Sequence, residues 1–172
     1  GVIPGGAGNL DLYEKFLKGL PNGVDIDLQA VVNKVFETIA LAKVSASGEE
    51  ARENNFLDFA DSVSVNPDHL IYDAKQAAIA LYDAGYRAPV KKKVKVVGAP
   101  GYATLLLGAQ GMYDSGFISE YDLAIAKKLA FVLAGGLVPY GTEVEEEYIL
   151  GLEKKAFLEL VQHPKTQQRM QH

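Results

Sequence analysis

Three consecutive lysines, Lys91, Lys92 and Lys93, with Lys95 two positions further on, form a dense positive cluster. Lysine ammonium groups bind phosphate as point charges, so the cluster is a candidate contact for the phosphate of a nucleotide-containing cofactor or of a nucleic acid. Lysine is also common on exposed sheet edges and in solvated connectors. Both interpretations stay open, and the sequence favours the second.

Histidine is the next residue type that could do chemistry. His69 follows Asp68 at the start of an expected helix and could act as a general base, but no nucleophile or oxyanion donor lies near it in the sequence. We therefore interpret it as a partly exposed first-turn residue. With His163 and His172 scattered and no cysteine, the ligand set of a metal site is missing, and we expect no metal.

Several motifs that carry catalysis or nucleotide binding are absent. The chain has no G-x-x-x-x-G-K-[ST] and no G-x-G-x-x-G pattern, and the run from Gly5 to Gly8 lacks the spacing of either. It also lacks the G-x-S-x-G turn of serine hydrolases. A nucleotide-binding fold and a catalytic triad are therefore disfavoured.

Acidic and aromatic residues are weaker indications of a functional site. The glutamates Glu143, Glu145, Glu146 and Glu147 could form an interaction patch, although the first turn of an expected helix explains them through its dipole. Six aromatic residues could line an acyl or ring pocket, although at helical spacing they more often belong to the core. They are Tyr102, Tyr113, Phe117, Tyr121, Phe131 and Tyr140.

The composition is that of an ordinary globular protein. Among 172 residues, 17 Lys and Arg face 22 Asp and Glu, for a net charge of −5, which argues against nucleic acid as a partner. No apolar stretch approaches the roughly 20 residues of a membrane span. The absence of cysteine is compatible with a reducing compartment, and we expect a cytoplasmic protein.

Hydrophobic periodicity predicts a mainly α fold with about seven helices and one or two short extended segments. We expect three segments, namely residues 1–86, a basic connector at 87–101 and a helical part at 102–172 that packs with the first. The expected extended segments lie at 62–65, as a short strand or a link, and at 94–97. The expected helices lie at 10–20, 28–42, 47–55, 67–84, 102–113, 119–134 and 142–162, with a further one after Pro164.

Capping residues define several of these helix ends. Asn9 and Asp27 are expected N-caps. Capping boxes are expected from Ser47 with Glu50, Ser119 with Asp122, and Thr142 with Glu145. The expected stops are Gly85 for the helix that follows Pro67 and the pair Gly135–Gly136 for the helix at 119–134.

Residues 1–9, with the sequence GVIPGGAGN, resemble the G-x-x-P-G-x-G-G stretch of the enoyl-CoA hydratase/isomerase (crotonase) superfamily. The family's S-A-x-E-A-x-x-x-G-L segment is similar to residues 47–57, although Asn55, Phe56 and Leu57 stand where the family has Gly-Leu. Residues 152–170 resemble the terminal crotonase helices. The chain looks most like the C-terminal region of bacterial multifunctional proteins that join a 3-hydroxyacyl-CoA dehydrogenase to a hydratase/isomerase domain. Residues 87–141 are longer than in single-domain members.

This resemblance implies an α/β parent domain in which backbone N–H groups polarise a thioester and carboxylates move protons. Those groups precede the glycine motif in the family, so they would lie upstream of Gly1. Only Gly5 can be carried over, as a backbone N–H near the active-site water, and a glycine needed only for the turn is an equal alternative. NAD and acyl-CoA are implied for the parent, and no cofactor for these residues alone.

The leading hypothesis is therefore a C-terminal part of a fatty-acid β-oxidation enzyme that supplies acyl-pocket wall and oligomer contacts and is inactive alone. We expect it to form a homo-oligomer, because faces meant for the rest of the parent would be exposed. A free-standing helical interaction module without catalysis is the alternative. A third hypothesis is that Lys91, Lys92 and Lys93 contact the phosphates of CoA.

Overall fold

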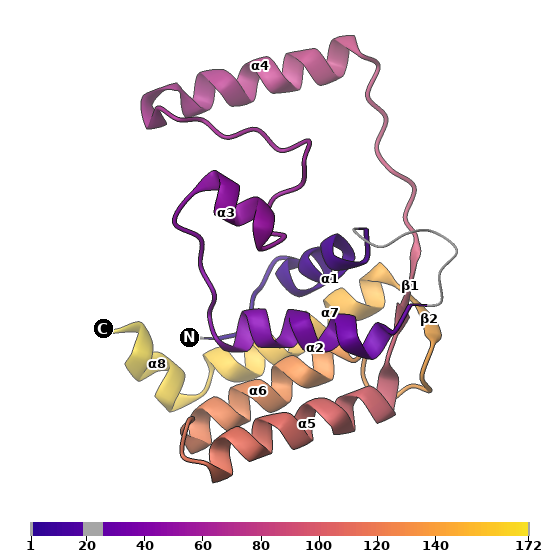
Figure 1. The fold of residues 1–172 in the computed structure, drawn as a ribbon, viewed down its shortest axis with the longest axis vertical. Helices are drawn as coiled ribbons and strands as arrows, with labels where there is room; N and C mark the ends of the chain where they lie inside the picture. Colours follow the sequence, from indigo (N-terminus) through magenta and orange to yellow (C-terminus); the bar gives the residue numbers. More distant parts are fainter. Residues whose placement is uncertain (1, 19–25, 172) are drawn as a thin grey trace. The chain divides into compact units, whose positions relative to one another are not determined.

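The computed structural model describes residues 2–18 and 26–171, which are mainly helical, as the sequence predicts (Figure 1). Eight α-helices, one short 3₁₀ turn and two strands occur within them. In chain order these are α1 (Gly8–Lys18), α2 (Leu28–Ala40), α3 (Gly48–Glu53), the 3₁₀ turn Pro67–His69, α4 (Leu70–Asp83), β1 (Lys93–Val96), α5 (Gly98–Asp114), α6 (Glu120–Leu133), β2 (Thr142–Glu145), α7 (Glu146–Val161) and α8 (Pro164–Met170). No helix of this part of the chain is long and apolar enough to cross a membrane.

The chain forms two units, one of residues 1–44 with 92–172 and the other of residues 45–91. The first unit therefore joins the two ends of the sequence, and the second is a continuous insertion between α2 and β1. This partition differs from the expected segments 1–86, 87–101 and 102–172, which remain a prediction about domain organisation.

Helix α6 is at the centre of the first unit, where it packs against α5, α7, α2 and α1. Its buried side chains include Leu129 and Val132, and the facing positions of α2 include Val32 and Val35, all at most 1% exposed. The two residues named on each helix are three positions apart and so lie on one face, which is apolar and loses its contact with water on packing.

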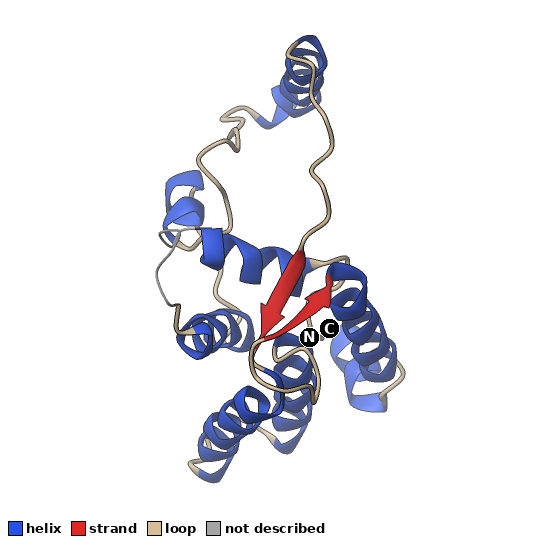
Figure 2. Cartoon of the chain, turned by 90° about the vertical axis from the view of Figure 1, so that its right-hand side faces the viewer, coloured by secondary structure: helices blue, strands red, loops and turns tan. Residues whose placement is uncertain are grey.

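Strands β1 and β2, red in Figure 2, form an antiparallel pair. Val94 and Val96 of β1 face the core and alternate with exposed lysines, as the twofold period of a strand requires. Buried Tyr13 of α1 donates a hydrogen bond from its hydroxyl to the Lys95 carbonyl oxygen at 2.7 Å, and burial raises the pKa of this tyrosine. The predicted extended segment at 94–97 is confirmed for its first three residues.

The expected helix at 142–162 is wrong at its start. Thr142–Glu145 is strand β2, whose Thr142 pairs with Val96 and whose Val144 pairs with Val94, and α7 begins only at Glu146. Pairing with a segment some 50 residues earlier overrides the local Thr142–Glu145 pattern, which therefore forms no capping box. Two of the four clustered glutamates, Glu143 and Glu145, consequently lie on β2 and not in a helical first turn.

Most other helix ends follow their local sequence. Asp27 accepts hydrogen bonds from the backbone of residues 29 and 30, and Ser119 forms the expected capping box with Asp122. Ser47 caps α3, but the Glu50 carboxylate accepts from Ala46 N–H and not from the Ser47 backbone. Gly85, Gly135 and Gly136 have φ of +72°, +72° and +77°, as residues that end helices in the left-handed region do.

The expected N-cap at Asn9 is wrong. Helix α1 begins at Gly8, so Asn9 lies inside its first turn, fully buried, and its side chain bonds away from the helix to the Pro4 carbonyl oxygen and to Glu153. A short polar side chain has several possible backbone and side-chain partners, and only the tertiary fold decides among them.

The second unit, residues 45–91, contains α3, the 3₁₀ turn and α4. Residues 62–65 pair with no strand of the described residues and form the link that was the alternative to a strand. Helix α4 has no buried residue. Its exposed large apolar side chains are Leu70, Ile71, Tyr72, Ile79, Leu81 and Tyr82.

Candidate functional site

The glycine-rich segment before α1 makes a tight turn at Gly6 and Ala7. Gly6 has φ of +64° and Ala7 has φ of +76°, in the left-handed region that costs a residue with a side chain roughly 1–2 kcal/mol. A Cβ placed on Gly5 would lie 3.6 Å from the Phe157 ring, an ordinary contact. Neither its φ nor its surroundings therefore require glycine at position 5.

Glu153 of α7 holds this turn. Its buried carboxylate accepts hydrogen bonds from Ala7 N–H at 2.8 Å, from Asn9 N–H at 3.2 Å and from Asn9 Nδ2 at 2.7 Å. The Asn9 amide also donates to the Pro4 carbonyl oxygen at 2.9 Å. Because these partners lie about 145 positions apart in the sequence, α7 fixes the conformation of the segment that enters α1.

Sequence reasoning missed Glu153, although a signal exists. On α7 the buried positions are Ile149, Glu153, Ala156 and Leu160, so one glutamate occupies the apolar stripe of the helix. A carboxylate is rarely fully buried without partners, and its place in such a stripe predicts a buried hydrogen-bonding role.

A hollow of about 560 Å³ lies beside the turn. Gly5, Gly6 and Ala7 line one side of it, and the remaining lining residues come from α7, namely Leu150, Glu153, Lys154 and Phe157. The candidate residue Gly5 thus lies at the wall of an open cavity, next to a carboxylate whose oxygens are both engaged by N–H donors.

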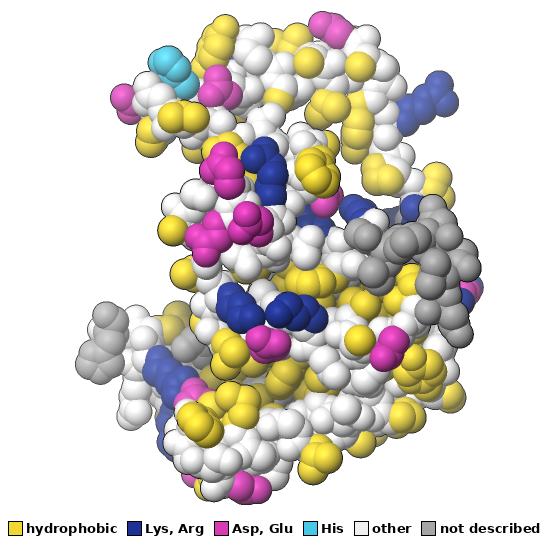
Figure 3. All heavy atoms as spheres, viewed as in Figure 1, with side chains coloured by type: hydrophobic (Ala, Val, Ile, Leu, Met, Phe, Trp, Pro, Cys, Tyr) yellow, Lys and Arg dark blue, Asp and Glu magenta, His cyan; other side chains and the backbone are white. Residues whose placement is uncertain are grey.

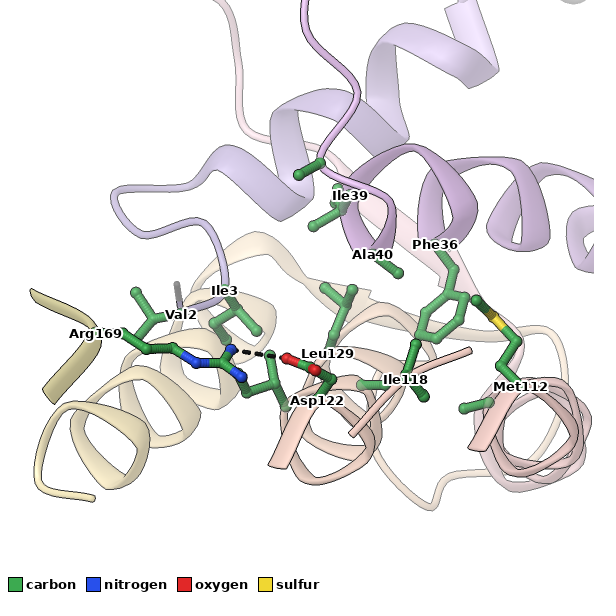
Figure 4. Close-up of a pocket in the computed structure, with 14 residues that line it drawn as sticks. Val2, Ile3, Phe36, Ile39, Ala40, Met112, Ile118, Asp122, Leu129 and Arg169 are labelled. Carbon is green, nitrogen blue, oxygen red and sulfur yellow. Dashed lines mark hydrogen bonds and ion pairs between the residues drawn. The ribbon is translucent and has the colours of Figure 1, made fainter. Parts of the chain in front are cut away.

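A second pocket, of about 280 Å³, is lined mainly by apolar residues (Figure 4). Its walls come from the N-terminal segment, α2, the end of α5, α6 and α8. The apolar lining residues are Val2, Ile3, Phe36, Ile39, Ala40, Ala42, Ala109, Met112, Ile118, Ile125, Ala126 and Leu129. An apolar cavity of this size suits a chain-like or small hydrophobic ligand.

The polar residues of this pocket are Asp122 and Arg169, which form an ion pair at 2.7 Å. The hydrogen bond from Arg169, helped by those from Ser119, lowers the pKa of Asp122 to about 2 against the opposing effect of burial. The Arg169 guanidinium also lies 5.0 Å from the centre of the Tyr121 ring, and His163 stacks on this ring at 4.5 Å. The Tyr121 and Thr166 hydroxyl groups hydrogen-bond to each other, so several contacts hold α8 at the pocket.

A further hollow of about 250 Å³ lies between α2 and α5. It shares Phe36, Ala40 and Met112 with the apolar pocket. Figure 3 shows hydrophobic side chains gathered on this face over α2, α5 and α6. Apolar residues thus make up most of the lining of both hollows on this side of the first unit.

The expected lysine site carries acidic neighbours. Lys93 lies opposite Glu145 on the paired strands with an Nζ–Oε1 distance of 3.6 Å, and Lys95 lies opposite Glu143. The backbone N–H of Lys92 donates to Glu146 at 3.2 Å. Lys91, Lys92 and Lys93 are all exposed. The glutamates therefore offset part of the positive charge, and a phosphate contact by these lysines stays a prediction.

The predicted aromatic set does not form one pocket. Tyr121 is buried and Tyr102 meets Phe131 edge to face at 5.6 Å, whereas Phe117 is 80% exposed. None of the six lines the apolar pocket, whose one aromatic residue is Phe36. His69 is exposed in the 3₁₀ turn, and His172 lies outside the described residues. No group of three or more possible metal ligands occurs in residues 2–18 and 26–171.

Comparison with known proteins gives one informative match. The chain is 60% identical over all of its 172 residues to a probable 3-hydroxyacyl-CoA dehydrogenase of Bacillus subtilis (strain 168). It spans only 21% of that relative's length. No protein-family model matches the chain, and no solved structure matches it.

Proposed function

We propose that these 172 residues work as part of a longer 3-hydroxyacyl-CoA dehydrogenase of fatty-acid β-oxidation, one that also carries an enoyl-CoA hydratase/isomerase activity. Within that parent they form a wall of the acyl pocket and an assembly surface. The observation that carries the proposal is the 60% identity, over the whole chain, to a probable 3-hydroxyacyl-CoA dehydrogenase. The resemblance of residues 1–9 and 47–57 to crotonases supports the hydratase/isomerase part.

The apolar pocket suits an acyl chain. Twelve of its fourteen lining residues are apolar, and the ion pair of Asp122 with Arg169 neutralises the remaining two. A fatty acyl chain is stabilised by burying its methylene groups, each by about 0.8 kcal/mol, and needs no polar partner along its length. In this proposal the thioester and the CoA moiety lie outside the pocket.

Catalysis in this proposal depends on groups elsewhere in the parent. The described residues do not fit a nicotinamide dinucleotide, because β1 and β2 are antiparallel and no G-x-G-x-x-G turn leads from a strand into a helix. NAD would be held by another part of the parent. The contribution of this chain to hydration would be the Gly5 backbone N–H, which orients the attacking water while carboxylates upstream move protons.

Assembly would involve α4. Ile71 and Tyr82 are each 84% exposed, and α4 buries no residue within its own unit. Exposed apolar side chains on a helix of this length are typical of surfaces that a protein partner covers. We take the partner to be a second copy of the parent, as closed symmetric association is common among soluble enzymes.

The experiment that tests this function compares two proteins. The parent made from its full gene should oxidise 3-hydroxyacyl-CoA with NAD and hydrate crotonyl-CoA, and the 172-residue chain alone should do neither. Hydration by the isolated chain at a rate near that of the parent would contradict the division of roles. A parent with neither activity would remove the enzyme assignment and leave the helical interaction module.

A further inference from the structure

We infer that Glu153 is a positioning residue that sets the turn from Gly5 to Gly8 and thereby aims the Gly5 backbone N–H. This inference rests on the proposed function where it concerns catalysis. Its structural half, that the Glu153 carboxylate imposes the turn, stands on the geometry alone.

The turn needs an external constraint. Ala7 has φ of +76°, and a residue with a Cβ leaves that conformation unless its surroundings hold it there. The hydrogen bond from Ala7 N–H to Glu153 Oε1, at 2.8 Å, acts on the strained residue itself. Asn9, two residues later, is held by Oε2 through both its backbone and its side chain. The carboxylate therefore clamps the turn on both sides of Gly8.

Packing alone does not explain a glutamate here. Glu153 is 3% exposed on an otherwise apolar stripe, and burying a carboxylate costs free energy that an aliphatic residue of similar size would avoid. That cost is offset only by donors, and the donors on the described residues all come from Ala7 and Asn9. What a carboxylate provides at this position, and an aliphatic side chain would not, is thus the conformation of the turn.

Because both carboxylate oxygens of Glu153 accept hydrogen bonds, replacing this glutamate by glutamine is an informative test. Glu153→Gln preserves shape, but one end of its side chain becomes an NH₂ group, which has no acceptor capacity. Turned one way it faces Ala7 N–H, and turned the other way it faces both Asn9 donors. In either orientation of the side chain, the new NH₂ group faces an N–H donor of Ala7 or Asn9 and cannot accept a hydrogen bond from it.

The test uses the full parent with Glu153→Gln and with Glu159→Gln as control, because Glu159 is an exposed glutamate of the same helix. We expect amide hydrogen exchange at Ala7 and Asn9 to accelerate at least tenfold in Glu153→Gln. We also expect kcat for crotonyl-CoA hydration to fall at least tenfold with KM within about twofold, while NAD-dependent dehydrogenation stays unchanged. The control should alter none of these quantities.

Unchanged exchange at Ala7 and Asn9 in Glu153→Gln would overturn the inference, and so would faster exchange with an unchanged hydratase kcat. If the unsubstituted parent lacks hydratase activity, the proposed function fails at that step, and the exchange rates alone decide whether Glu153 imposes the turn. If Glu153→Gln does not fold, Ala7→Gly is added to it, since glycine removes the strain at residue 7. Recovery of folding by Ala7→Gly supports the clamp, and failure to recover contradicts it.

Discussion

Replacing Ala126 by leucine should change the chain-length preference of the parent enzyme. Ala126 is buried on α6 and lines the apolar pocket of about 280 Å³. Leucine adds three carbon atoms, and because Ala126 lines the pocket, these atoms would take up part of the pocket volume. The room they take is then lost to the end of a long acyl chain.

The expected loss of binding free energy follows from the number of methylene groups that leucine displaces from the pocket. Each buried methylene contributes about 0.8 kcal/mol, so losing two to three of them weakens the binding of a long acyl chain by about 2 kcal/mol, or roughly thirtyfold. A four-carbon substrate does not reach the blocked volume and should react as before. The expected signature is a fall in kcat/KM for long-chain relative to short-chain substrates.

The assay measures kcat/KM of the parent for crotonyl-CoA and for a sixteen-carbon enoyl-CoA. Ala124→Leu is the matched control, because Ala124 is an exposed alanine on the same helix. A ratio of the two constants that stays unchanged in Ala126→Leu, or that changes equally in Ala124→Leu, would contradict this prediction.

Three further predictions concern the ion pair, the lysines and α4. Arg169→Gln should destabilise the chain by at most about 1 kcal/mol at pH 7, because both partners are more than a third exposed. The folded pKa of Asp122, about 2, lies below its ordinary value of 3.8, so the stabilisation by the ion pair is present above pH 4 and falls as the pH falls towards 2. A difference in thermal unfolding as large at pH 2 as at pH 7 would contradict this prediction. Changing Lys91, Lys92 and Lys93 together to alanine should raise the KM for acyl-CoA several-fold, and an unchanged KM would exclude the phosphate contact. Ile71→Asp with Tyr82→Asp should weaken self-association of the parent in sedimentation, whereas exposed Gln76→Glu should not; a parent that sediments only as a monomer would exclude the assembly role.

Most local patterns predicted the structure correctly where the deciding contacts are also local, although the capping box of Ser47 with Glu50 formed only in part. Asp27 and Ser119 cap their helices because the groups they bond lie within three residues. Thr142 shows the opposite case, because its partner Val96 lies far away in the sequence and the strand pairing overrides a plausible capping pattern. The mainly α character was predictable for the same reason, since amphipathic periodicity is repeated along each helix.

The candidate sites were harder to predict from the sequence than the helices were. Gly5 was found by resemblance, whereas Glu153, which holds the turn, was hidden in a stripe that looked like core. The apolar pocket brings together residues as distant in the sequence as Val2 and Arg169, and no pattern of residue spacing predicts that they lie close together. Ala126 can be recognised as a pocket residue only once α2, α5 and α6 are packed together.

Photolabelling of the full parent, with an enoyl-CoA that carries a photoreactive group near the end of its acyl chain, would locate the acyl chain in the protein. We expect labels on the peptides of α2, α5, α6 and the α5–α6 link that line the apolar pocket, with Met112 of α5 and Ile118 of the link among the marked residues. Unlabelled long-chain acyl-CoA should abolish this labelling by competition. Competed labelling confined to other parts of the parent would contradict the assignment of these residues to the acyl pocket.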